Sequence, residues 1–206
     1  MVLAGMLALL SRERTVAADD VIDQVVAVVA GDLIMQSDVN AVRVLGLLST
    51  RRGASNEEVL NQLIDRTLVL SEIERYSPPE PSASAISDGV GAIRSRFGSR
   101  EAFDQAMARV GFTERRLQQT IRQDLRINAY LQQRFTAPMP GDDEITAYYQ
   151  AHPEEFSAGG RGVALVDARE QVAQAIRQRR YEALVADWIA GLRRRASIMR
   201  VGTSGG

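Results

Sequence analysis

Two short runs of β-branched residues lie near the start of a sequence that is otherwise rich in helix signals. In residues 21–35, VIDQVVAVVAGDLIM, these runs flank Gly31 and Asp32, which predicts a tight β-hairpin with Gly31 at positive φ. Two strands alone are only marginally stable in water, so the hairpin needs a third strand. The best candidate is residues 197–201, near the opposite end of the chain. The sequence therefore predicts a small antiparallel sheet through which both ends of the chain close one core.

Helix signals fill most of the sequence between these two regions. The clearest helix begins with the capping-box sequence SNEE at residues 55–58, carries an apolar stripe as far as Ile73 and ends before three prolines within residues 78–81. Four other apolar segments of helical period follow side chains that can act as N-caps, which are Ser37, Ser99, Thr113 and Asp167. The glycine-rich residues 157–162 predict a linker. We therefore expect a mainly α-helical fold with a small antiparallel β-sheet.

The N-terminal segment has the features of an export signal. Its first ten residues, MVLAGMLALL, are apolar, and the small residues Val16, Ala17 and Ala18 follow a polar stretch. A run of this length is too short to cross a bilayer as a helix, which favours a signal peptide over residues 1–18 and no stable membrane insertion. The basic residues that usually begin such a signal are missing. The alternative interpretation is a buried N-terminal helix.

Composition argues against several classes of function. The 25 basic and 26 acidic residues leave a formal net charge of −1, so no global field attracts nucleic acid or anionic lipid. Cysteine is absent, which excludes disulfides, thiolate nucleophiles and cysteine-ligated metals. The single histidine, His152, has no nucleophile near it in sequence and is interpreted as a helix-terminal or solvent-facing residue. No phosphate-binding loop is present. We expect a protein that is not an enzyme and holds no cofactor or metal.

Three segments resemble the SurA-like parvulin chaperones of the bacterial periplasm, and the resemblance covers most of the chain after the expected signal peptide. Residues 25–39, VVAVVAGDLIMQSDV, resemble the opening hairpin of that family and its run into the first helix, although the family often has Asn where Ala30 stands. Residues 99–133 resemble the helical hairpin of the chaperone's N-terminal domain. Residues 169–196 and the terminal strand resemble the helix and strand that complete the N-terminal core.

The resemblance also implies a domain organisation in which the prolyl-isomerase domain is missing. Residues 141–157 resemble the stretch that leads into that domain, but only the ten residues 158–167 separate it from the last helix. Independent domains rarely fall below about 50 residues, so the isomerase cannot fit. The expected parts are a signal peptide (1–18), a SurA-N-like helical chaperone domain (19–136), a linker with a remnant helix (137–166) and a C-terminal helix and strand that pack back on the core (167–206).

The function implied by the resemblance is that of an ATP-independent periplasmic chaperone without isomerase activity. Its partners would be unfolded client polypeptides, outer-membrane β-barrel proteins above all, bound in a hydrophobic groove. The candidate client-binding residues are Phe97, Phe103, Met107 and Phe112, whose alternative role is in the core. Two further functions remain open, which are a non-catalytic envelope scaffold and a residual peptidyl-prolyl isomerase with an unrecognised site.

Overall fold

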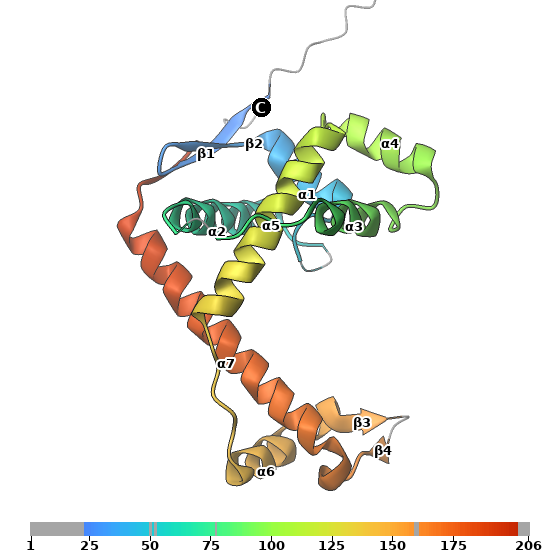
Figure 1. Ribbon diagram of the computed structural model, residues 1–206, viewed down its shortest axis with the longest axis vertical. Helices are drawn as coiled ribbons and strands as arrows, with labels where there is room; N and C mark the ends of the chain where they lie inside the picture. The colour runs from blue at the N-terminus through green and yellow to red at the C-terminus, as the bar shows by residue number, and fades with distance from the viewer. Residues whose placement is uncertain (1–22, 50, 52, 77, 159–160, 202–206) are drawn as a thin grey trace, which may run out of the picture.

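The computed structural model describes residues 23–49, 51, 53–76, 78–158 and 161–201, and the predicted signal peptide therefore lies outside the described residues. Within these ranges the fold is mainly α-helical with a small three-stranded antiparallel sheet, as predicted (Figure 1). The helices are α1 (Gln36–Leu45), α2 (Asn56–Glu74), α3 (Ala83–Arg94), α4 (Arg100–Arg109), α5 (Glu114–Arg134), α6 (Asp142–Ala151), the 3-10 helix η1 (Pro153–Phe156) and α7 (Leu165–Arg195).

The three-stranded sheet is built from both ends of the described chain. Its order is β2 (Asp32–Met35), β1 (Val25–Val29) and β5 (Ile198–Arg200), with β1 in the centre. Val28 pairs with Leu33 on one side and with Met199 on the other. The predicted pairing of the opening hairpin with a strand near residue 200 is thus confirmed.

The hairpin turn sits one residue earlier than predicted. Ala30 and Gly31 form it, with φ of 52° and 98°, and Asp32 is already the first residue of β2. Positive φ at both central positions is the geometry of a type I′ turn, whose twist matches that of the flanking strands. Gly31 has the predicted conformation. Ala30 adopts a left-handed conformation, which is energetically unfavourable for a residue that has a Cβ atom.

Most of the predicted helix starts are confirmed, and two are corrected. The Ser55 hydroxyl accepts from the Glu58 amide and the Glu58 carboxylate accepts from the Ser55 amide, which completes the capping box of α2. Ser99 and Thr113 cap α4 and α5 in the predicted way.

The corrected starts are those of α1 and α7. Ser37 does not cap α1, because the Asp38 carboxylate accepts from the Met35 amide and the helix begins at Gln36. Asp167 lies inside the first turn of α7, because its amide already donates to the carbonyl of Ala164, at 2.9 Å.

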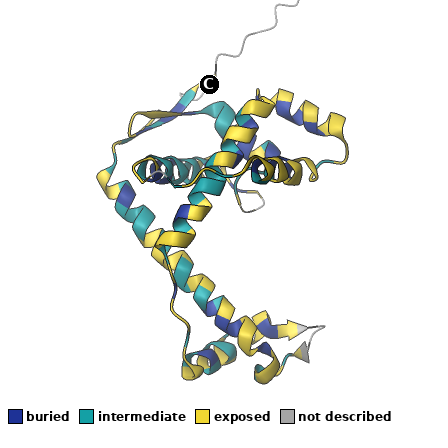
Figure 2. Ribbon diagram, in the orientation of Figure 1, coloured by how far each residue is buried: buried dark blue, intermediate teal, exposed yellow. Residues whose placement is uncertain are grey.

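Two neighbouring cores form the main body, which comprises the three-stranded sheet and α1 to α5. One core lies between the inner face of the sheet, α1 and α2, and the C-terminal parts of α5 and α7 close it with Tyr130 and Leu192. The other joins α3, α4 and the first half of α5 to α1. Figure 2 shows these buried stripes on the inward faces of the helices.

A third core lies at the other end of α7, in what we call the small lobe (α6, η1, β3, β4 and the first part of α7). Ile145 and Phe156 pack there against Val172 and Ile176 of α7. The stretch predicted as a linker carries β3 (Ser157–Ala158) paired with β4 (Arg161–Gly162). The Val163 amide closes this hairpin by donating to the Phe156 carbonyl, at 2.9 Å. In Figure 1, α7 runs from the small lobe to the sheet of the main body.

Candidate functional site

The residues predicted to bind clients belong to the core of the main body. Phe103, Met107 and Phe112 are only 3%, 6% and 7% exposed, and Phe97 is half-buried with its ring 5.5 Å from that of Phe103. These side chains belong to the core that joins α3, α4 and α5 to α1. The burial of Phe103, Met107 and Phe112 supports the alternative role in the core, and client binding by the four residues stays a prediction.

An open cleft of about 600 Å³ lies where the end of α5 and the following chain meet α7. Its walls are dominated by side-chain amides and aromatic rings. The amides are one helical turn apart on each helix, so each pair shares a face. They are Asn128 and Gln132 on α5, and Gln174 and Gln178 on α7. We call this feature the amide cleft.

The four amides of the cleft are solvent-exposed and retain hydrogen-bonding capacity. Gln174 and Gln178 each donate one bond, to Glu170 and Glu182 of the same helix at 2.7 and 2.8 Å. Within the described part of the chain, Asn128 and Gln132 make no side-chain hydrogen bond. A carboxamide both donates and accepts, so these groups can pair with any polypeptide backbone.

Phe135 and Tyr181 supply the aromatic part of the cleft wall. The ring of Phe135 is held 5.5 Å from that of Trp188, and the Arg134 guanidinium lies 5.6 Å from the Phe135 ring centroid. Burial raises the pKa of the Tyr181 phenol above its usual value. Rings that are fixed by their neighbours bury apolar surface at a small entropic cost.

A second exposed surface is the outer face of the three-stranded sheet. Leu33 and Met199 are 59% and 62% exposed, and they flank Val28 because all three share one register row. Val201 follows Met199 two residues later on the same side. An antiparallel sheet with one solvated face ordinarily has polar side chains there. We call this apolar row the outer sheet face.

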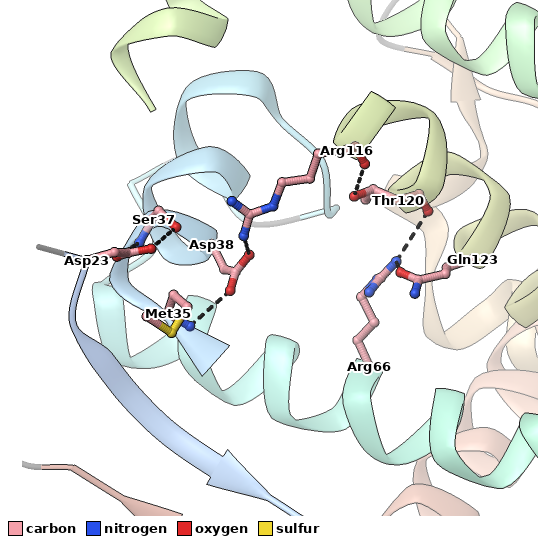
Figure 3. A network of polar contacts seen from close by, with 8 residues as sticks. All are labelled: Asp23, Met35, Ser37, Asp38, Arg66, Arg116, Thr120 and Gln123. Carbon is pink, nitrogen blue, oxygen red and sulfur yellow. Dashed lines mark hydrogen bonds and ion pairs between the residues drawn. The ribbon is translucent and has the colours of Figure 1, made fainter. Parts of the chain in front are cut away.

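The polar network between α1, α2 and α5 is engaged within the fold (Figure 3). Asp38 accepts from the Met35 amide at 2.9 Å and from Arg116 at 2.6 Å. Arg66 donates to Asp124 at 2.8 Å and to the Thr120 carbonyl at 3.2 Å. These groups satisfy one another, so the network fastens the hairpin and α2 to α5.

His152 lies at the C-terminal end of α6, in agreement with the helix-terminal interpretation. Its ring stacks on Tyr148 with centroids 4.1 Å apart, and its Nε2 lies 3.2 Å from Arg179. Among the residues that the structure describes, no group of three or more His, Cys, Asp or Glu side chains is placed to hold a metal ion. In the same residues, no helix is both long and apolar enough to span a bilayer.

Neither the known protein-family models nor the curated proteins contain a match to this sequence.

Proposed function

We propose that this protein is a non-enzymatic, ATP-independent chaperone that holds extended segments of unfolded polypeptide in the amide cleft. The observation that carries the proposal is the convergence of four side-chain amides and two aromatic rings, from α5, the chain that follows it and α7, around one open cleft of about 600 Å³. A cleft of that size is within the range of about 300–1,000 Å³ that is usual for ligand sites.

The chemistry of the cleft suits a ligand that has no fixed sequence. An unfolded chain presents an amide donor and a carbonyl acceptor at nearly every residue, and the carboxamides of Asn128 and Gln132 can pair with both. Phe135 and Tyr181 add apolar burial that does not depend on a particular partner side chain. Binding of this kind is broad and of modest affinity, because the client loses conformational entropy when it is held.

The proposal includes the location and the clients that the family resemblance implies. The protein would be exported to the periplasm by the leader expected over residues 1–18, and its clients would be unfolded outer-membrane β-barrel proteins. The cleft itself favours no client class, because backbone pairing is common to all polypeptides. Client selectivity is therefore a separate question for experiment.

The test compares the aggregation of two unfolded clients, a β-barrel protein and a soluble protein, with and without the chain. We expect the wild-type chain to protect the barrel protein from aggregation. The double variant Asn128→Ala, Gln132→Ala should bind the unfolded barrel protein about tenfold more weakly, since each hydrogen bond is worth about 0.5–1.5 kcal/mol. The matched control is Gln133→Ala, which changes an exposed glutamine of the same helix outside the cleft.

If the wild-type chain, the double variant and the control protect the client equally, the amide cleft is not the client-binding site. Protection of neither client would favour the scaffold alternative instead. Acceleration of a proline-limited refolding phase, which normally takes tens to hundreds of seconds, would contradict the non-enzymatic assignment.

A further inference from the structure

We propose that β5 and the outer sheet face accept an extended apolar polypeptide segment as a fourth strand of the sheet. This second contact point rests on the proposed function only in that the segment would come from an unfolded client. It lies on the three-stranded sheet of the main body, apart from the amide cleft.

The backbone of β5 is hydrogen-bonded on one side only within the described residues, where its sole partner is β1. The Ser197 carbonyl accepts from the Ala30 amide at 2.9 Å, and the Val201 amide donates to the Val26 carbonyl at 3.0 Å. Backbone groups alternate in direction along a strand, so the N–H and C=O groups of Ile198 and Arg200 face away from β1. They form an open edge that can pair with another chain.

The outward side of β5 carries an apolar side chain, because its charged residue packs on α2. On β5 the charged residue is Arg200, whose guanidinium donates to Asn61 at 2.6 Å and to Glu57 at 3.3 Å, on α2 beneath the sheet. The outward side chain of β5 is Met199, which is apolar and flexible. Within the described residues, the solvent side of this edge therefore presents an apolar side chain next to unpaired backbone groups.

The size of the outer sheet face favours a single extended segment over a second copy of this chain. The apolar row consists of four side chains, Val28, Leu33, Met199 and Val201, whereas about 20–30 residues on each side contribute to a stable interface. A stable protein–protein interface needs about 800 Å² on each partner. A strand of five or so alternating residues, by contrast, gains backbone hydrogen bonds from β5 and covers Met199 and Val201 with its own apolar side chains.

The first experiment isolates the outward amide of residue 200. The probe is a fluorescein-labelled nine-residue peptide of alternating valine and threonine, and its binding to the full chain is followed by anisotropy. Arg200→Ala removes the side chain but keeps the amide, whereas Arg200→Pro removes both and is sterically tolerated on an edge strand. We expect Arg200→Pro to bind the peptide about tenfold more weakly than Arg200→Ala, and equal binding by the two variants would overturn the proposal.

The second experiment leaves the protein unchanged, so it stands even if Arg200→Pro fails to fold. The same peptide is N-methylated at its five central residues, which removes backbone donors and keeps every side chain. We expect the affinity to fall about tenfold or more, and equal affinity of both peptides would mean that no strand pairing occurs.

The double variant Asn128→Ala, Gln132→Ala separates the two proposals. It should bind the unmethylated peptide as the wild-type chain does, because the amide cleft lies outside the sheet. An equal loss of peptide binding in this variant would place the peptide in the cleft and overturn the strand proposal. Retained peptide binding without any protection of clients would contradict the proposed function alone.

Discussion

The Arg116 guanidinium lies 2.6 Å from the Asp38 carboxylate and joins the first turn of α5 to the first turn of α1 across 78 residues of sequence (Figure 3). The other carboxylate oxygen of Asp38 accepts from the Met35 amide, at 2.9 Å. One side chain therefore satisfies a free amide at the start of α1 and fixes how the opening hairpin meets α5.

Replacement of Asp38 by alanine should remove both of these interactions. We expect Asp38→Ala to lower the free energy of unfolding by about 1–3 kcal/mol, the loss of a cap plus a partly shielded charged hydrogen bond. Urea unfolding followed by circular dichroism measures the change. Asp88→Ala is the control, because Asp88 is exposed on α3 and makes no side-chain bond within the described residues. Equal losses in the two variants would contradict the role assigned to Asp38.

The two interior glycines of α3 should respond to alanine in opposite directions. A Cβ atom on Gly89 would lie 2.5 Å from Cγ2 of Ile121, whereas one on Gly91 would meet nothing within 4 Å. Gly91→Ala should stabilise the protein by about 0.5–1 kcal/mol through helix propensity. Gly89→Ala should destabilise it, since overpacking a core usually costs about 1–3 kcal/mol. Thermal unfolding of the pair tests this, and stabilisation by both would show that α3 packs less closely on α5.

Ala30 offers a site for stabilisation, because its φ of 52° is left-handed. We expect Ala30→Gly and Ala30→Asn to raise the free energy of unfolding by about 0.5–1 kcal/mol, since both residues tolerate this conformation. Ala129→Gly on the exposed face of α5 is the opposite control and should destabilise by about 1 kcal/mol. A loss of stability in both Ala30 variants would contradict the type I′ turn.

Phe103 should behave as a core residue in stability measurements. We expect Phe103→Ala to lower the free energy of unfolding by about 3–5 kcal/mol, because the ring is 3% exposed and its removal leaves a cavity. Met139→Ala is the comparison, since Met139 is 61% exposed and its truncation should change stability by less than about 0.5 kcal/mol. If the Phe103→Ala variant folds with unchanged stability, the assignment of Phe103 to the core is contradicted.

The local features of the fold could be predicted because they depend on neighbours in sequence. The capping box at Ser55 and Glu58 and the caps at Ser99 and Thr113 are short-range hydrogen bonds, which residue identity largely determines. The start of α1 was missed by one or two residues for the same kind of reason. Several side chains near it, Ser37 and Asp38 among them, can act as acceptors, and the sequence does not rank them.

The candidate site could be predicted only in part. Sequence periodicity identified Phe103 and Met107 as apolar positions on α4, but it could not distinguish a core face from a groove, because both have the same pattern. The amide cleft had a usable signal, since Asn128 and Gln132, like Gln174 and Gln178, are spaced four residues apart. Their convergence depends on the angle at which α5 meets α7, and no local pattern contains that angle.

By itself, the sequence determined the helical character of the chain, most of its helix starts and the need for a third strand to support Val25–Val29. These follow from caps, periodicity and the marginal stability of an isolated hairpin. Only the tertiary structure decided which apolar side chains stay exposed, how the small lobe packs and where the amides of α5 and α7 meet. Those properties arise from contacts between distant segments, whose geometry is set by the packing of the whole chain.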